Sequence, residues 1–173
     1  LVKGPQALED LLGKKPELPL KEPWPVMEPE VPKLPFPRLT YTQLVELARE
    51  NGVEVEWGED LSMEANRAIA EVHGGFFFIT RWPSAGKPFY ALPYLDRMEE
   101  CRAFDLNFAE KEVCSGAQRV HMHELLRERI AAQGLDPESF SYYLDAFRYG
   151  MPPHAGWGLG TERLLMVITR TPN

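Results

Sequence analysis

The sequence has 173 residues, of which 44% are hydrophobic and 26% are charged, a composition typical of one globular domain with a hydrophobic core. Its net charge of −7 argues against a free-standing nucleic-acid-binding protein that relies on a broad basic surface, and leaves room for local basic contacts with a polyanion. Without a membrane-spanning apolar run or a signal-peptide core, we expect a soluble, cytoplasmic protein with no membrane partner. The two cysteines, Cys101 and Cys114, lack C-x-x-C spacing, which argues against a thiolate metal site or a disulfide framework.

The N-terminal part of the chain is predicted to be a proline-rich connector. Residues 5–13 have the pattern of a short helix that ends at Gly13. Eight of the sixteen prolines then lie between Pro16 and Pro37, and proline excludes helix interiors and central strands. We therefore assign residues 1–37 to this connector and residues 38–173 to the folded domain.

Two helices are predicted next. Thr40 and Gln43 have the spacing of a capping box, and the helix that they begin stops before Asn51. A short strand is expected over residues 53–57. Ser62 can cap a second helix, whose predicted buried residues are Ala65, Ile69 and Val72.

A sheet is predicted after the second helix. Residues 75–80 form a continuous apolar run, which is typical of a central strand covered on both faces. A loop carrying Lys87 leads into a second expected strand, residues 89–92, and residues 93–100 are expected to form a polar connection. A lysine at a sheet edge is commonly only a solvated residue, so Lys87 by itself does not identify a site.

A hairpin carrying two acidic residues is predicted over residues 103–115. Residues 103–108 and 112–115 read as strands, and residues 109–111 read as the turn. A hairpin centred near residues 108 and 109 makes Asp105 and Glu112 neighbours across the strands. Mg²⁺ bound with substrate phosphates would balance their charges, whereas the alternative is a hairpin with two solvated acids.

The C-terminal part of the sequence predicts two helices, a glycine-rich strand and a final helix. The first helix spans residues 121–133, and the second begins at Asp136, an N-cap followed by proline. Their expected inward residues are Leu125, Leu126, Ile130, Phe140, Tyr143, Leu144 and Phe147. Glycine at positions 156, 158 and 160 leaves one strand face without side chains, and Arg163 falls in the first turn of the last helix, residues 161–170. Close helix packing and a simple Arg163 ion pair are the structural alternative.

Several ordered motifs together resemble the class II aminoacyl-tRNA synthetases, specifically the C-terminal part of the catalytic domain of archaeal-type aspartyl-tRNA synthetases. The motifs are P-S-A-G-K-P-F-Y, R-A-F-D-L, E-V-C-S-G-A-Q-R-V-H, G-L-D-P-E-S-F, Y-L-D-A-F-R-Y-G-M-P-P-H-A-G and G-L-G-T-E-R-L. The resemblance runs from about residue 33 to residue 173. It implies an α+β fold in which an antiparallel sheet is flanked by helices, with only part of that fold present.

The resemblance also implies functions for individual residues. Asp105 and Glu112 match carboxylates that hold Mg²⁺ with ATP, and Ser115 matches a serine beside the metal and the substrate. Lys87 and Arg119 match the two cations that bind the side-chain carboxylate of aspartate. Strict alternation would place Glu112 and Arg119 on opposite faces, so we expect a bulge, at Gly116.

The third class II motif is matched by residues 156–170. Its arginine, Arg163, is expected to bind the ATP γ-phosphate and to act with Glu112 in catalysis. The R-x-H order of Arg119 and His121 is typical of aspartyl enzymes, whereas asparaginyl enzymes usually carry R-E-E or R-E-D, so His121 joins the expected aspartate site. The glycines expected to line the adenine and ribose are Gly156, Gly158 and Gly160.

The implied function is aspartate–tRNA ligation, with ATP, aspartate and tRNA-Asp, or also tRNA-Asn, as partners, Mg²⁺ as cofactor, and a homodimer as the assembly. The first and second class II motifs and an anticodon-binding domain have no counterpart in these residues. We therefore expect the chain to be part of a longer polypeptide and to be inactive alone. The alternatives are an asparaginyl-tRNA synthetase, a synthetase-derived asparagine synthetase, and a non-catalytic synthetase-like binding module.

Overall fold

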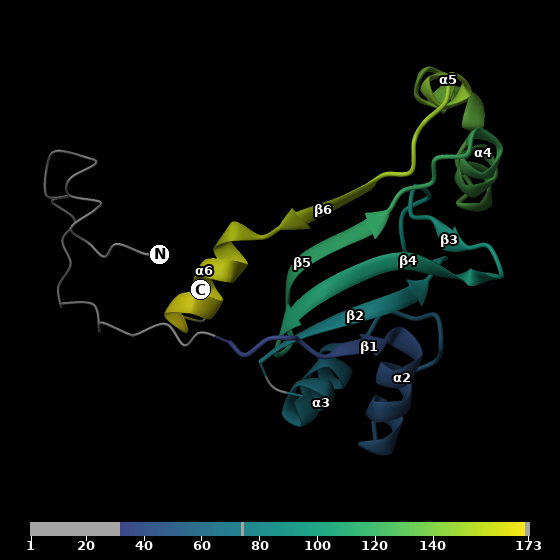
Figure 1. The fold of residues 1–173 in the computed structure, drawn as a ribbon. Helices are drawn as coiled ribbons and strands as arrows, with labels where there is room; N and C mark the ends of the chain where they lie inside the picture. Colours follow the sequence, from purple (N-terminus) through teal and green to yellow (C-terminus); the bar gives the residue numbers. More distant parts are fainter. Residues whose placement is uncertain (1–31, 74, 172–173) are drawn as a thin grey trace, which may run out of the picture.

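A six-stranded sheet forms the framework of the computed structural model, which describes residues 32–73 and 75–171. The strands follow the order β1-β2-β4-β5-β6, and β3 pairs with β4 (Figure 1). All neighbours are antiparallel except β1 and β2, which are parallel. The strands are β1 Arg38–Thr40, β2 Phe76–Pro83, β3 Pro93–Tyr94, β4 Arg97–Phe108, β5 Lys111–Gln118 and β6 Ala155–Leu159.

Helices flank this sheet in three separate places (Figure 1). Two helices lie beside β1 and β2, two helices lie together beyond the opposite end of the sheet, and the last helix follows β6. The α+β architecture expected from the sequence is therefore confirmed. The helices are α2 Tyr41–Glu50, α3 Met63–His73, α4 His123–Ala132, the 3₁₀ turn η1 Pro137–Phe140, α5 Ser141–Arg148 and α6 Thr161–Thr169.

The first hydrophobic core lies between α2, α3 and β2. The capping box that begins α2 is present, because Thr40 accepts a hydrogen bond from the Gln43 backbone and the Gln43 side chain accepts one from the Thr40 backbone. The Ser62 hydroxyl likewise accepts from the Ala65 backbone at 3.1 Å, as expected for the cap of α3. The core residues include Tyr41, Leu44, Ala65, Ile69, Phe77 and Ile79, all of them buried.

The second core joins α4 and α5 to the ends of the strands. Leu126 and Ile130 of α4 are fully buried against Leu144 and Phe147 of α5. Asp136 caps the η1 turn by accepting a hydrogen bond from the Glu138 backbone at 3.1 Å. The predicted inward residues Leu125, Phe140 and Tyr143 are only partly buried, and they pack around the edge of this core.

Strand β2 differs from its prediction in one respect. Phe77 and Ile79 are each 1% exposed, whereas Phe76 and Phe78 on the other face are only half-buried. Among the residues that the structure describes, aromatic rings and not a helix cover the second face, with Phe36 stacked 5.1 Å from Phe76. One face of β2 is therefore covered by α2 and α3, and the other face is covered by aromatic rings.

Three other expectations about secondary structure are wrong. Residues 53–57 and 89–92 are not strands, although Ala91 makes one isolated bridge with Arg119, and residues 93–100 contain β3 and the start of β4. Residues 53–57 and 89–92 have strand-like side-chain patterns, but a strand also needs a neighbour with free backbone groups. Val72 is 53% exposed because α3 contacts the core only through its Ala65 and Ile69 face.

The β4–β5 hairpin is also in a different register from the predicted one. A two-residue turn, closed by the pair Phe108 and Lys111, places Asn107 opposite Glu112, and an irregularity then places Asp105 opposite Ser115. Asp105 and Glu112 are therefore not cross-strand neighbours. The bulge lies opposite residues 106 and 107, and Gly116, where it was expected, pairs regularly with β4 and β6.

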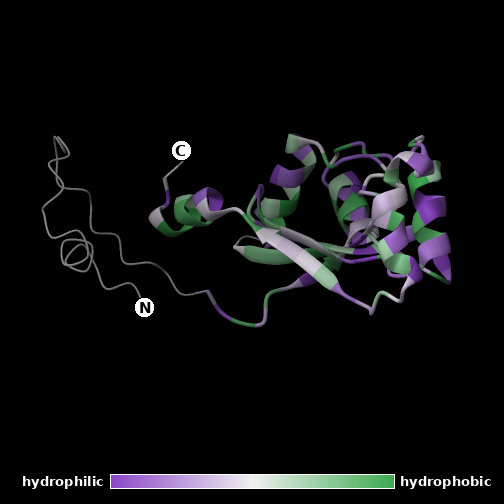
Figure 2. Ribbon diagram, turned by 90° about the horizontal axis from the view of Figure 1, so that it is seen from above, coloured by the Kyte–Doolittle hydropathy of each residue, from purple (hydrophilic) through white to green (hydrophobic). Residues whose placement is uncertain are grey.

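Two further expectations can be compared with the described residues. Both cysteines are buried and free of disulfides, and no helix within residues 32–73 and 75–171 has the length and hydropathy needed to cross a membrane. The predicted helix over residues 5–13 and most of the 1–37 connector lie outside the described residues. The last helix, α6, lies away from the other helices, and Figure 2 shows hydrophobic residues along it.

Candidate active site

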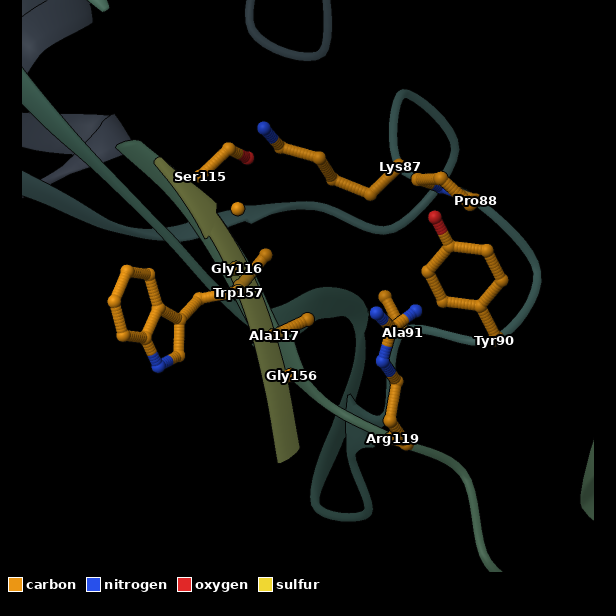
Figure 3. Close-up of a pocket in the computed structure, with 12 residues that line it drawn as sticks. Lys87, Pro88, Tyr90, Ala91, Ser115, Gly116, Ala117, Arg119, Gly156 and Trp157 are labelled. Carbon is orange, nitrogen blue, oxygen red and sulfur yellow. The ribbon is translucent and has the colours of Figure 1, made fainter. Parts of the chain in front are cut away.

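A cavity of about 250 Å³ lies beside strands β5 and β6 and the segment that follows β2. Figure 3 shows Lys87 and Arg119 entering it from different parts of the chain. The cavity is lined by Lys87, Pro88, Tyr90, Ala91, Ala103, Ser115, Gly116, Ala117, Arg119, Gly156, Trp157 and Gly158. Five predicted site residues are thus brought together here: Lys87, Ser115, Arg119, Gly156 and Gly158.

The Lys87 side chain is held between an aromatic ring and a carboxylate. Its Nζ lies 4.0 Å from the centroid of the Trp82 ring and 2.8 Å from Oδ2 of Asp105, and the side chain is 18% exposed. An ammonium group over an aromatic face is attracted to the ring, and the attraction grows when water is excluded. Lys87 is therefore a fixed, partly desolvated cation and not the solvated edge residue of the structural alternative.

Asp105 is buried beneath the cavity with both carboxylate oxygens engaged. Oδ2 accepts from Lys87, and Oδ1 accepts from the Ser115 hydroxyl at 2.5 Å. The residue is 2% exposed. The direct pairing of Asp105 with Ser115 across β4 and β5 places these side chains together, so the observed register creates this contact.

Arg119 supplies the second cation of the cavity. Its guanidinium carbon lies 4.0 Å from the centroid of the Tyr90 ring, and Figure 3 shows the two side chains next to each other. The Arg119 backbone N–H donates to the carbonyl of His154 at 2.8 Å. A Cβ on Gly156 would lie 3.1 Å from Nη2 of Arg119, so the absence of a side chain at Gly156 gives the guanidinium its place.

The other predicted nucleotide residues lie at the turn end of β5. Nη1 of Arg163 donates to the backbone carbonyl of Glu112 at 2.8 Å and lies 3.5 Å from Oε1 of the same residue. The Arg163 and Glu112 side chains are 55% and 45% exposed, so both can reach a ligand from solution. The Gly160 backbone N–H donates to the Val113 carbonyl at 2.9 Å, which fastens the start of α6 to β5.

Between the cavity and the Arg163–Glu112 pair, one face of β6 carries only the glycines Gly156 and Gly158. A Cβ placed on Gly158 would meet nothing within 4 Å, so the space above this residue is open. The intervening Trp157 is 67% exposed, and Figure 3 shows its indole pointing away from Lys87 and Arg119. A Cβ on Gly116 would lie 2.6 Å from Cβ of Trp157, so glycine at this position is required for close contact between β5 and β6.

His121 does not line the cavity. Its Nδ1 is buried and has no hydrogen-bond partner among the residues that the structure describes. The sequence prediction placed His121 with the substrate residues, but β5 ends at Gln118 and the chain turns toward α4 after Arg119. The sequence analysis missed three aromatic residues of this region, Trp82, Tyr90 and Trp157. A usable signal was that the first two lie near Lys87 in the sequence and that the third lies between two of the alternating glycines.

The two predicted metal ligands differ in their suitability for Mg²⁺. Glu112 has a half-exposed carboxylate, the oxygen ligand that Mg²⁺ prefers, whereas both Asp105 oxygens already accept hydrogen bonds. Within residues 32–73 and 75–171, no three His, Cys, Asp or Glu side chains cluster in a way that suits a metal ion. Of the two predicted ligands, Glu112 is therefore the one whose carboxylate is accessible to a cation, whereas Asp105 is held by Lys87 and Ser115.

Comparison with known families identifies the chain. Residues 7–173 match the family described as tRNA synthetases class II (D, K and N). The chain belongs to the class II tRNA synthetases. The match begins well before residue 33, so the likeness to this family extends further toward the N-terminus than the motifs indicated.

Two similar proteins carry the same name. The chain is 55% identical over 150 residues to an aspartate–tRNA(Asp/Asn) ligase of Archaeoglobus fulgidus, covering 87% of this chain and 35% of that protein. It is 51% identical to the ligase of the same name from Methanocaldococcus jannaschii, covering 85% and 34%. The chain thus spans about a third of the length of these curated relatives.

Solved structures of synthetases have the same fold. The asparaginyl-tRNA synthetase of Pyrococcus horikoshii superposes with a TM-score of 0.76 at 35% identity, covering 80% of this chain and 34% of that chain. An aspartyl-tRNA synthetase of Entamoeba histolytica also gives a TM-score of 0.76, at 33% identity, covering 80% and 30%. The α+β synthetase fold of the described residues is therefore established, and aspartyl and asparaginyl members share it.

Proposed function

We propose that this synthetase chain supplies the amino-acid-binding half of an aspartate–tRNA ligase. The observation that carries the proposal is the presence of two cations, Lys87 and Arg119, in one cavity of about 250 Å³. Arginine and lysine together suit a side-chain carboxylate, since each forms a charge-assisted hydrogen bond with it. The name of the relatives at 51–55% identity supports the same substrate.

Substrate binding follows from the groups already in place. Arg119 is available to the substrate carboxylate through its guanidinium N–H groups, while Tyr90 holds the guanidinium plane from one side. Lys87 would then contact two carboxylates, that of the substrate and that of Asp105, which already accepts from it at 2.8 Å. Ser115 keeps the second Asp105 oxygen occupied, so the negative charge of Asp105 stays directed at Lys87.

The chemical step needs positioning more than proton transfer. The aspartate α-carboxylate is ionised at neutral pH and can attack the ATP α-phosphate without a general base, forming aspartyl-adenylate and releasing pyrophosphate. Arg163 is placed to bind the departing phosphates once it releases Glu112. The adenylate then acylates the terminal ribose of tRNA, for which we propose tRNA-Asp, and also tRNA-Asn as the relatives' name indicates.

Magnesium would be held by Glu112 together with phosphate oxygens of ATP, with Asp105 as the second carboxylate predicted from the sequence. When bound, it supplies positive charge that offsets the charge of the phosphates. The open face above Gly158 leaves space for the planar base or the ribose of ATP, and this space does not depend on the metal. The homodimer, the cytoplasmic location and the domain boundary at residue 38 remain predictions.

An asparaginyl-tRNA synthetase is the second candidate, because solved asparaginyl enzymes share this fold. The two cations argue against it. An amide side chain leaves one of two positive charges without a counter-charge, and an unpaired, partly desolvated charge is costly. The observed cavity therefore favours aspartate over asparagine.

The test is amino-acid-dependent exchange of pyrophosphate into ATP, measured with the complete gene product that contains this sequence. We expect exchange with aspartate, and at least about a hundredfold lower kcat/KM with asparagine. Replacement of Arg119 with alanine should abolish the aspartate reaction. Equal use of the two amino acids, or an unchanged rate in the Arg119→Ala variant, would contradict the proposal.

A further inference from the structure

The segment that carries Lys87 is fastened to α4 and to the C-cap residue of that helix. Nη2 of Arg129 donates to the carbonyl of Ser84 at 2.7 Å, and Nε2 of Gln133 donates to the carbonyl of Lys87 at 2.7 Å. Residues four apart lie on the same face of a helix, so Arg129 and Gln133 reach the segment together. The two hydrogen bonds span the start and the end of residues 84–87.

The start of this segment is held from both sides. The Ser84 backbone N–H donates to the Glu99 carbonyl in β4 at 2.7 Å, while the Ser84 carbonyl accepts from Arg129 in α4. Ser84 is 4% exposed. The backbone before Lys87 is therefore fixed between the sheet and the helix, whereas a loop at this position would otherwise lie free on the surface.

Arg129 makes this contact without an ion pair. Among the described residues no carboxylate lies within ion-pairing distance of its guanidinium, and its Nε is buried without a hydrogen-bond partner. Burial lowers the pKa of the Arg129 guanidinium. Arg129 is half-buried, and a partly desolvated cation whose side chain has one backbone carbonyl as its acceptor gains little stability over an apolar residue. Stability of the fold therefore does not account for an arginine here.

We propose that Arg129 and Gln133 are positioning residues for Lys87, the cation that receives the substrate carboxylate. Their bonds to the backbone on either side of residue 86 determine where the Lys87 side chain begins. From that origin Nζ reaches both the face of Trp82, at 4.0 Å, and Asp105, at 2.8 Å. This inference rests on the proposed function for the identity of the ligand, and it assigns a substrate-orienting role to a helix outside the cavity.

Kinetics of the complete protein provide the first test. The variants Arg129→Met and Gln133→Ala should each raise the KM for aspartate about tenfold and leave the KM for ATP within about twofold, because only the amino-acid cation is displaced. Arg129→Lys, which keeps a donor and a charge, should recover part of the loss. Gln133 is exposed, so its replacement leaves the core intact.

The matched control is Arg127→Met. Arg127 lies on the same helix, carries the same charge and is 53% exposed, with its guanidinium 3.5 Å from Glu138. We expect this variant to keep the wild-type KM for aspartate. Equal changes in the KM values for aspartate and ATP in the Arg129 and Gln133 variants, or an equal effect in Arg127→Met, would show a merely structural role and overturn the proposal.

A spectroscopic test does not depend on activity. The complete protein labelled with 5-fluorotryptophan gives a fluorine resonance for Trp82, which the variant Trp82→Phe assigns. This resonance senses the Lys87 ammonium, 4.0 Å from the centroid of the ring. Lys87→Met should shift this resonance, and Arg129→Met should shift it in the same direction, whereas Arg127→Met should not. An unmoved Trp82 resonance in Arg129→Met overturns the positioning role, while absent aspartate-dependent exchange by the wild type would contradict only the proposed function.

Discussion

Lys87 and Asp105 form an ion pair beneath the cavity, with 2.8 Å between Nζ and Oδ2, and Asp105 is 2% exposed. This pair links the cavity to the interior of the sheet. It also reduces the repulsion between the two cations of the cavity, since Asp105 offsets the charge of Lys87. Removal of Asp105 should therefore lower the stability of the fold.

Asp105→Ala should lower the free energy of unfolding by about 3 kcal/mol, because removing one partner of a buried pair leaves the other charge poorly solvated. Urea unfolding followed by tryptophan fluorescence measures this change. The control is Glu99→Ala, whose contact with Arg97 is 4.0 Å long and exposed, and which should change the value by less than about 0.5 kcal/mol. Equal losses in the two variants would rule out a buried pair.

Gly116→Ala should destabilise the sheet, whereas Gly158→Ala should not. A Cβ on Gly116 would meet Trp157 at 2.6 Å and the Phe104 ring at 2.7 Å, which forces β5 and β6 apart. We expect a loss of about 2 kcal/mol. Gly158 has nothing within 4 Å, so its variant should unfold within about 0.5 kcal/mol of the wild type. Thermal and urea unfolding of the two variants test the difference, and similar losses would contradict it.

Gly156→Ala should weaken aspartate use through Arg119. The new methyl group would lie 3.1 Å from Nη2, so the guanidinium must move by a few tenths of an ångström. We expect the KM for aspartate to rise about tenfold with the KM for ATP unchanged, since we propose that the displaced group binds the amino acid. Gly158→Ala should do the reverse, raising only the KM for ATP. Pyrophosphate exchange at varied aspartate and ATP separates the two effects, and a shared pattern would refute them.

Thr40→Ala should lower stability by about 1 kcal/mol, because the first turn of α2 loses the acceptor for the Gln43 backbone N–H. Thr40→Ser retains a hydroxyl and should recover most of the loss. Thermal unfolding of the three proteins is sufficient to measure this. A loss in Thr40→Ser as large as that in Thr40→Ala would show that packing of the methyl group, and not the cap, stabilises the helix.

Both cysteines should resist alkylation in the folded protein. Burial raises the pKa of the Cys101 thiol and of the Cys114 thiol, and only the thiolate reacts. Mass spectrometry should find iodoacetamide on neither residue near about pH 8 without urea, and on both after unfolding. Rapid labelling of the folded protein would contradict the burial.

The same thiols predict an alkaline loss of stability. A raised folded-state pKa contributes stability that is fully present below the unfolded-state pKa and is lost as pH rises through the folded-state value. The unfolding temperature should therefore fall as the pH rises above the ordinary thiol pKa. Cys114→Ala should reduce this slope, and an unchanged slope would show that other groups cause it.

Short-range signals in the sequence predicted much of this fold correctly. The capping pattern of Thr40 and Gln43 involves neighbouring residues, so it identified the start of α2 without any knowledge of the tertiary structure. The glycine-rich strand and α6 followed from alternating glycines and a helical pattern in the same way. Lys87, Ser115 and Arg119 were identified through ordered motifs, and the structure brings all three to one cavity.

The pairing of the acidic residues could not be obtained in this way. The register of β4 and β5 depends on a two-residue turn at Ala109, which has a positive φ of 50°, and on a bulge further along the hairpin. One residue more or less in either feature changes every partner. Asp105 therefore faces Ser115 and not Glu112, an outcome that side-chain alternation alone does not specify.

The sequence by itself determined the capped starts of α2 and α3, the family motifs and the residue types of the site, because these depend on neighbouring positions. Only the tertiary structure decided the partners of those residues. Arg129 binds the carbonyl of Ser84 across 45 positions in the chain, and Lys87 binds Asp105 across 18. Contacts of this kind arise where separate elements meet, and they leave no periodic pattern along the chain that could predict them.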